Sequence, residues 1–119
     1  MTLIVWDVEK NVVRKARRED LYEAIYMITQ LIPLGRVTSY KNISEILGVN
    51  PRLIGQALKN NDKPIIIPCH RVIASNGYLK NYSRGGIVVK KKLLVLEGVI
   101  VKGEKVSRKY FIDLKKILS

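Results

Sequence analysis

Cysteine and histidine are almost absent from this 119-residue chain, which has one of each, Cys69 and His70. A single thiol excludes an internal disulfide, which fits a reducing compartment. One thiol and one imidazole are too few for a structural zinc site without carboxylates, so no metal is expected, and no cofactor either. The two residues are neighbours, however, and this placement makes them the first candidates for chemistry.

Long apolar runs are also missing. No stretch approaches the roughly 20 residues that span a bilayer. Charged residues between Lys10 and Arg18 interrupt the apolar N-terminal run where a signal peptide would lie. We therefore expect a cytoplasmic protein, associated with the nucleoid if the source is prokaryotic, with no membrane contact.

Acidic residues are scarce. Ten Asp and Glu stand against 22 Lys and Arg, which gives a formal net charge of +12. Between Ala24 and Leu96, eleven basic side chains face two acidic ones, Glu45 and Asp62. This excess indicates a polyanionic partner, most simply nucleic acid. An anionic membrane is a weaker alternative, because the chain has no long basic amphipathic helix with Trp and Phe on its apolar side.

The pattern of apolar residues predicts a fold that is mainly α-helical with a small β component. Residues 1–18 are predicted to form a short N-terminal arm or hairpin, and residues 19–119 the domain itself. Apolar residues at helical spacing predict an amphipathic helix over 19–32, and a further strong helix is predicted over 87–97. Residues 99–119 are predicted to form a hairpin or strand and then a short terminal helix.

Two short helices in the middle of the chain are predicted to form a helix-turn-helix. Ser39 is a good N-cap for a helix over 40–47, and Gly48 is placed to end it. Asn50 then caps a third helix that ends near Asn60. Two short helices joined by a turn that contains Gly are typical of this DNA-binding motif.

The third predicted helix has a face suited to nucleic acid. Its outer side carries two cations, an amide and a bare backbone position, namely Arg52, Gly55, Gln56 and Lys59. Charge favours phosphate and small size favours close approach, so this face is predicted to contact DNA. The alternative is an ordinary solvated surface.

The cysteine follows three isoleucines, residues 65–67, that stand between two prolines. This run predicts a short buried strand that ends at Pro68, since proline cannot donate to a sheet. Cys69 is then either a small buried hydrophobe or a nucleophile that a nearby base converts to the thiolate. Neighbours on a strand point to opposite faces, so His70 can assist Cys69 only if the chain turns after Pro68 or a water bridges the two.

Glu97 is the one acidic residue between Asp62 and Glu104. It lies in the last turn of its predicted helix, where the helix dipole disfavours an anion. It pairs either with a neighbouring lysine on the surface or with His70. The second arrangement would make a Glu–His–Cys chain, in which the carboxylate orients the imidazole and the imidazole takes the thiol proton.

The motif Ile-Pro-Cys-His-Arg-Val, residues 67–72, resembles the active-site motif of the O6-alkylguanine-DNA alkyltransferases, which repair DNA by direct reversal of damage. Four further stretches resemble the same family: Ile32 to Tyr40, Asn50 to Asn61, Asn81 to Gly86, and Lys90 with Leu93 to Gly98. The resemblance covers about residues 19–98. It implies a winged-helix or helix-turn-helix-like catalytic domain, with the family's N-terminal α/β domain nearly absent.

The resemblance implies single-turnover chemistry. Cys69 would attack the alkyl carbon on O6 of a guanine and keep the alkyl group, usually methyl, as a thioether. His70 would take the thiol proton through a water, Glu97 would orient His70, and Tyr40 would hydrogen-bond the purine. The remaining implied roles are DNA contacts by Ser39, Arg52, Gly55, Gln56, Lys59 and Arg71, a base pocket lined by Pro68, Val72, Tyr82 and Ser83, and a brace by Asn61 beside the cysteine segment.

The implied partner is double-stranded DNA that contains O6-alkylguanine, bound by a monomer. The target base must leave the duplex to reach a buried sulfur, and Arg52 would enter the stack in its place. The loop between Asn81 and Gly85 is one residue longer than is usual in the family, through Ser83 or Arg84. Three alternatives remain open: a non-enzymatic alkyltransferase-like binder of damaged bases, a plain helix-turn-helix regulator and, more weakly, a cysteine hydrolase.

Overall fold

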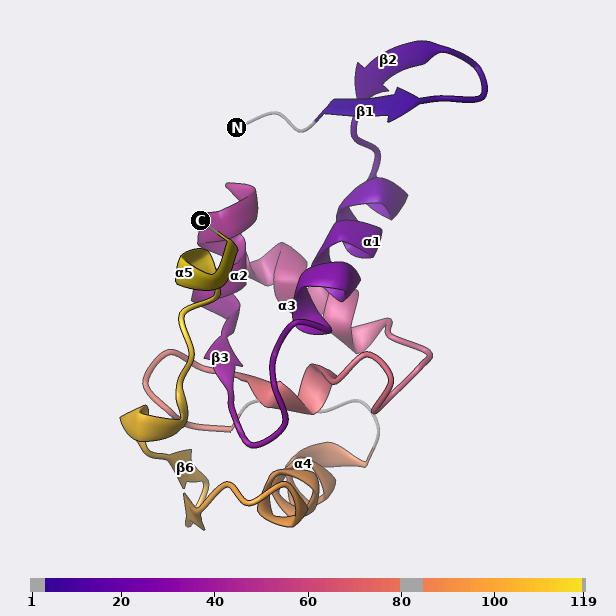
Figure 1. Ribbon diagram of the computed structural model, residues 1–119. Coiled ribbons are helices and arrows are strands. Elements are labelled where there is room, and N and C mark those ends of the chain that lie inside the picture. The colour runs from indigo at the N-terminus through magenta and orange to yellow at the C-terminus, as the bar shows by residue number, and fades with distance from the viewer. Residues whose placement is uncertain (1–3, 80–84, 119) are drawn as a thin grey trace.

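The computed structural model describes residues 4–79 and 85–118. The molecule measures 50 × 28 × 21 Å and is elongated because an N-terminal hairpin projects from a helical body (Figure 1). The mainly α architecture with a small β component is confirmed. In chain order the elements are β1 (Ile4–Asp7), β2 (Val12–Lys15), α1 (Arg18–Thr29), β3 (Thr38–Ser39), α2 (Tyr40–Leu47), α3 (Pro51–Lys59), the 3₁₀ turn η1 (Cys69–Arg71), β4 (Val72–Ile73), α4 (Gly86–Leu96), β5 (Val101–Lys102), β6 (Lys105–Val106), the 3₁₀ turn η2 (Arg108–Tyr110) and α5 (Leu114–Leu118).

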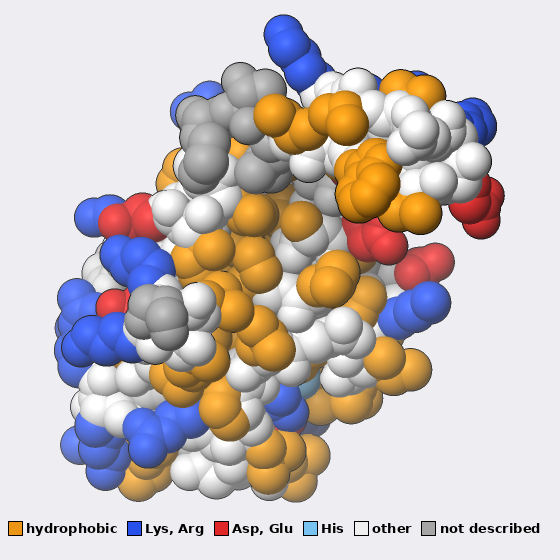
Figure 2. All heavy atoms as spheres, turned by 45° about the horizontal axis from the view of Figure 1, so that its top comes forward, with side chains coloured by type: hydrophobic (Ala, Val, Ile, Leu, Met, Phe, Trp, Pro, Cys, Tyr) orange, Lys and Arg blue, Asp and Glu red, His pale blue; other side chains and the backbone are white. Residues whose placement is uncertain are grey.

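The N-terminal hairpin pairs β1 with β2 in antiparallel register, from Ile4 opposite Lys15 to Asp7 opposite Val12. An ion pair at 2.6 Å between Arg14 of β2 and Asp20 of α1 ties it to the body. Apolar side chains gather on the hairpin and on the middle of the same face of the body (Figure 2). The division of the chain into an arm and a domain near residue 18 stays a prediction.

The body has two apolar cores with a short parallel strand pair between them. The first core joins α1, α2 and α3 and includes Cys69 and Val72, while the second joins Ile73 to α4 and the C-terminal hairpin. β3 and β4 pair in parallel, with Thr38 opposite Val72 and Ser39 opposite Ile73. Because successive strand residues point to opposite faces, Val72 enters one core and Ile73 the other.

The helix-turn-helix forms at the predicted residues. The Ser39 hydroxyl accepts a hydrogen bond from the Asn42 N–H at 3.0 Å, and the Asn50 side chain accepts one from the Arg52 N–H at 2.9 Å. Each cap satisfies a backbone donor that the first turn of its helix leaves without a partner. Gly48 ends α2 with a φ of 67°, a conformation that glycine adopts without a Cβ penalty.

The isoleucine run is not the buried strand that its composition predicts. Ile65 and Ile66 are 61% and 69% exposed, and Ile65 has a positive φ of 75°. The chain turns tightly here, since the Ile67 N–H donates to the Lys63 carbonyl at 2.9 Å, and of the three isoleucines Ile67 alone enters the core. From the sequence alone, a short apolar run can be either a buried strand or a turn in which one residue is buried. Which of the two forms depends on contacts with residues from elsewhere in the chain.

Candidate active site and nucleic-acid face

Cys69 opens the turn η1 directly after Pro68, so the chain does change direction at the predicted place. Its side chain is packed in the first core and the residue is 5% exposed. The Asn61 amide donates to the Cys69 sulfur at 3.3 Å and to the Ile67 carbonyl at 2.9 Å. Asn61 therefore contacts the sulfur directly and also braces the segment that leads to it.

His70 is buried beside the carboxylate of Glu97. Its Nε2 lies 3.0 Å from Glu97 Oε2, and the imidazole has no exposed surface. The ring is not angled for a well-aligned hydrogen bond, and Nδ1 has no hydrogen-bond partner within the described part of the chain. At 3.0 Å the carboxylate nevertheless favours a proton on the facing nitrogen, which leaves Nδ1 as the acceptor.

Arg71 holds Glu97 in place. Its Nε donates to Oε1 at 2.9 Å and its Nη2 to Oε2 at 2.7 Å, which is a bidentate pair. Its Nη1 donates to the Ile32 carbonyl at 2.8 Å. Of the two partners considered for Glu97, the structure therefore has His70 and not a neighbouring lysine, and Arg71 is a third member of the group.

Burial sets the protonation state of this group. It lowers the pKa of His70 more than the adjacent Glu97 raises it, so the imidazole is neutral near pH 7 and able to accept a proton. For Glu97, burial opposes ionisation, but the hydrogen bonds from Arg71 and the contact with His70 outweigh it and lower the pKa. A neutral imidazole beside a fixed carboxylate is the arrangement that general-base chemistry needs.

Lys90, which the sequence analysis placed in a family-like stretch but gave no role, is a further member of the site. It is 0% exposed in α4, and its ammonium donates to the Val72 carbonyl at 2.7 Å. The same nitrogen lies 3.4 Å from the Tyr40 hydroxyl. Burial lowers the pKa of Lys90 to about 8 and raises that of Tyr40 to about 12, so Tyr40 remains a protonated donor at neutral pH. Its burial could not be predicted from helical spacing, because Lys90, Lys91 and Lys92 are consecutive lysines and nothing in the pattern sets one of them apart.

Replacing Lys90 by Met should remove a pH dependence from the stability of the fold. Unfolded lysine titrates near 10.4, so between about pH 8 and 10.4 the unfolded chain binds a proton that the folded chain does not. The Lys90 contribution to the free energy of unfolding therefore rises with pH over this interval, by on the order of 3 kcal/mol. Urea unfolding at several pH values measures it, with Lys92→Met as the exposed control. Parallel pH profiles for wild type and Lys90→Met would contradict the assignment.

The outer face of α3 is open to solvent. Arg52, Gln56 and Lys59 are exposed, while the opposite side of the helix, with Ile54, lies in the first core. A Cβ added at Gly55 would meet no atom within 4 Å, so the helix backbone is bare at this point. The face is available for nucleic acid as predicted, and its contact with DNA stays a prediction.

Four predicted site residues are buried or hydrogen-bonded within the protein. Ser39 is buried and its hydroxyl accepts the capping hydrogen bond of α2, while the guanidinium of Arg71 donates to Glu97 and to the Ile32 carbonyl. Their contacts with DNA stay predictions. The side chains of Pro68 and Val72 are buried, and the Val72 carbonyl accepts a hydrogen bond from Lys90, so their place in the base pocket stays a prediction. Tyr82 and Ser83, predicted for the base pocket, lie outside the described residues, as do Asn81 and Arg84.

Two absences hold for residues 4–79 and 85–118. No group of three or more His, Cys, Asp and Glu side chains is placed to hold a metal ion there. Nor does this part of the chain contain a helix long and apolar enough to cross a bilayer.

Residues 20–99 match the family model described as 6-O-methylguanine DNA methyltransferase, DNA binding domain. A methylated-DNA–protein-cysteine methyltransferase of Metallosphaera sedula is 46% identical over 78 residues, which are 66% of this chain and 49% of that protein. The protein of the same name from Pyrobaculum aerophilum is 49% identical over 69 residues, which are 58% of this chain and 46% of that protein. The chain thus spans about half the length of these curated relatives.

Solved structures resemble the fold as well. The O6-methylguanine-DNA methyltransferase of Pyrococcus kodakaraensis aligns with a TM-score of 0.61 and 40% identity, over 66% of this chain and 46% of that one. Schizosaccharomyces pombe Atl1, in complex with damaged DNA containing O6-carboxymethylguanine, aligns with a TM-score of 0.74 and 27% identity. That alignment covers 82% of this chain and 98% of Atl1.

Proposed function

The chain belongs to the 6-O-methylguanine DNA methyltransferase family, and from this premise we propose that it repairs DNA by moving an alkyl group from O6 of guanine to Cys69. The observation that carries the proposal is the environment of one sulfur. Cys69 accepts a hydrogen bond from Asn61, and the next residue, His70, is a buried neutral imidazole paired with Glu97. A lone structural cysteine would need none of these groups.

The proposed reaction is a displacement at the alkyl carbon. The Cys69 thiol gives its proton to His70 through a water, and the sulfur forms a bond to the alkyl carbon as the bond from that carbon to O6 breaks. The electron pair of the broken bond stays on the guanine, which takes up a proton. Tyr40 donates a hydrogen bond to the leaving purine, a role supported by its raised pKa, which keeps the phenol protonated. The thioether is stable, so each molecule acts once.

DNA contact is assigned to the helix-turn-helix. The exposed cations of α3, Arg52 and Lys59, would bind phosphates, and the bare backbone at Gly55 would permit close approach. The base must be extruded from the duplex, since the sulfur is nearly buried. Arg52, at the exposed start of α3, would hold the space that the base leaves. We assign these steps to a monomer bound to double-stranded DNA that contains O6-alkylguanine.

The test is a methyl-transfer assay read by peptide mass. Incubation with duplex DNA that contains O6-methylguanine should add about 14 Da to the peptide that carries Cys69, in a 1:1 ratio of methyl to protein, because the thiolate keeps the group. An unmodified sulfur with the lesion removed would indicate a hydrolase. An unmodified sulfur with the lesion intact would exclude transfer.

A second candidate function is recognition of damaged bases without transfer. It is favoured by the alignment with Atl1, which this chain matches over 98% of the Atl1 length, whereas it matches under half of the P. kodakaraensis methyltransferase. The same assay separates the two, since a pure binder would show tight binding to the damaged duplex and no change in mass. The Cys69 environment favours transfer.

A further inference from the structure

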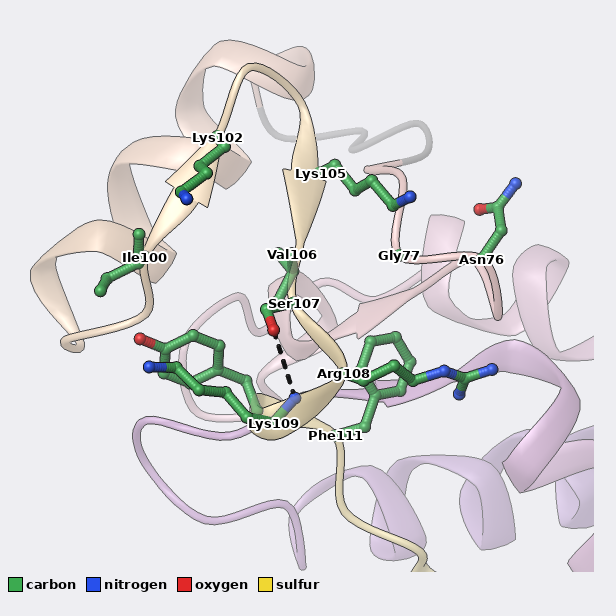
Figure 3. Close-up of a pocket in the computed structure, with 11 residues that line it drawn as sticks. Asn76, Gly77, Ile100, Lys102, Lys105, Val106, Ser107, Arg108, Lys109 and Phe111 are labelled. Carbon is green, nitrogen blue, oxygen red and sulfur yellow. Dashed lines mark hydrogen bonds between the residues drawn. The ribbon is translucent and has the colours of Figure 1, made fainter.

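A basic cleft lies in the C-terminal part of the molecule, and Cys69 is not among the residues that line it. Its volume is about 700 Å³, and it is bounded by the β5–β6 hairpin, η2 and the turn at Asn76 and Gly77 (Figure 3). Most of its lining comes from residues 100–111, beyond the stretch that matches the family model. The proposed alkyl transfer makes no use of it.

The positive charges that line the cleft are not paired with acidic side chains of the described residues. Four of its lining residues are basic and exposed, and none is acidic. Within the described residues no carboxylate forms an ion pair with any of the four, which are Lys102, Lys105, Arg108 and Lys109. Like charges held this close repel one another, so a polyanion that enters the cleft relieves the repulsion and displaces counterions.

Two half-buried aromatic rings lie beneath these cations. Lys109 Nζ is 5.1 Å from the centre of the Tyr110 ring, and the Arg108 guanidinium is 5.2 Å from the centre of the Phe111 ring. The backbone here is fixed, because the Val37 N–H donates to the Tyr110 carbonyl at 2.9 Å. Flat rings and a guanidinium on a fixed backbone are groups on which nucleobases stack.

The other wall is equally fixed. The Val106 N–H donates to the Gly77 carbonyl at 2.9 Å, and a Cβ at Gly77 would lie 2.6 Å from the Val106 carbonyl oxygen. Gly77 has a φ of 92°, so both its conformation and this close approach require glycine. The segment that forms this wall leads directly from β4, the strand that follows the turn of Cys69.

We propose that this cleft binds an unpaired strand of nucleic acid. The exposed cations suit the phosphates, and the rings of Tyr110 and Phe111 suit the bases. A duplex is less suitable, because its bases are stacked inside and its convex backbone does not enter a concave site. An acidic peptide would use the cations but not the rings. If the proposed function holds, the cleft directs the protein to lesions in unpaired DNA, where extrusion of the base costs least.

The experiment measures binding of the full chain to a fluorescent oligo-dT of about 12 nucleotides. Fluorescence anisotropy is recorded from about 50 to 300 mM salt. The triple variant Lys102→Gln/Lys105→Gln/Lys109→Gln should reduce the slope of log K against log salt by about 2, because each phosphate contact to a single strand contributes about 0.7. A matched triple, Lys10→Gln/Lys15→Gln/Lys92→Gln, removes the same charge outside the cleft and should leave the slope unchanged.

A separate variant tests the contribution of the aromatic rings. Tyr110→Leu should weaken oligo-dT binding about tenfold at an unchanged salt slope, because it removes stacking and no charge. Equal slopes for the two triple variants would overturn the proposal, as would displacement of the oligonucleotide by poly-glutamate at equal charge. Methyl transfer on damaged duplex is measured in parallel. If the wild type transfers no methyl group but the variants change oligo-dT binding as expected, the proposed function alone is rejected. If the wild type transfers methyl but the cleft variants bind oligo-dT as the wild type does, the cleft proposal alone is rejected.

Discussion

Cys69→Ala should take up no methyl group from O6-methylguanine DNA, while its affinity for the same duplex stays within about twofold of the wild type. The sulfur is the one thiol in the chain, so its loss removes the nucleophile altogether. DNA binding is assigned to the outer face of α3, which the substitution does not touch. Mass spectrometry of the intact protein measures transfer, and fluorescence anisotropy measures binding.

Cys69→Ser is the control for packing. Serine nearly fills the volume of cysteine and still accepts the Asn61 hydrogen bond, but its hydroxyl is far less acidic and should also fail to transfer. Both variants should bind damaged duplex, which distinguishes a lost nucleophile from a lost fold. A methyl group on any other residue of either variant would contradict the assignment of Cys69.

Glu97→Gln should slow alkyl transfer on the order of 100-fold and lower the free energy of unfolding by about 3 kcal/mol. The amide has no charge with which to pair Arg71, whose side chain is only 12% exposed, and it no longer fixes the proton on His70. The two effects have different readouts, since single-turnover kinetics report the imidazole and urea unfolding reports the ion pair.

The dependence of the free energy of unfolding on acidic pH provides a second measurement for Glu97. Its pKa is lowered in the folded state, so its stabilising contribution is present above the unfolded value of about 4.3 and is lost as the pH falls through the folded value. Glu97→Gln should therefore unfold with a shallower dependence on pH below about 4.3 than the wild type. Glu104→Gln removes the same charge from an exposed position and should change neither rate nor stability. Equal losses in the two variants would show that net charge, and not the Arg71 pair, is responsible.

The helix-turn-helix was predictable from the sequence because its signals act over a few residues. Ser39 and Asn50 cap their helices with their own side chains, and Gly48 supplies the left-handed conformation that ends α2. The predicted outer side of α3, with Arg52, Gln56 and Lys59, is exposed in the structure, and Ile54 on the opposite side is buried. The chemistry-bearing neighbours Cys69 and His70 were equally visible, as the single thiol and the single imidazole of the chain.

Other features depended on segments that are far apart in the chain. The sequence left two partners open for Glu97, and packing of α4 against η1 selected His70 and added Arg71. It gave no sign that Lys90 would be buried at the Val72 carbonyl, or that the basic C-terminal residues would enclose a cleft. It also misassigned Ile65 and Ile66 as buried.

The physical reason is the range of the interactions involved. Caps, turns and helical periodicity are decided within one or two turns of chain, so the sequence by itself determined which helices form and which of their faces are apolar. Burial of an ion, the state of a proton and the shape of a cleft are differences in solvation, and only the tertiary structure decides which groups lose water and which partners replace it.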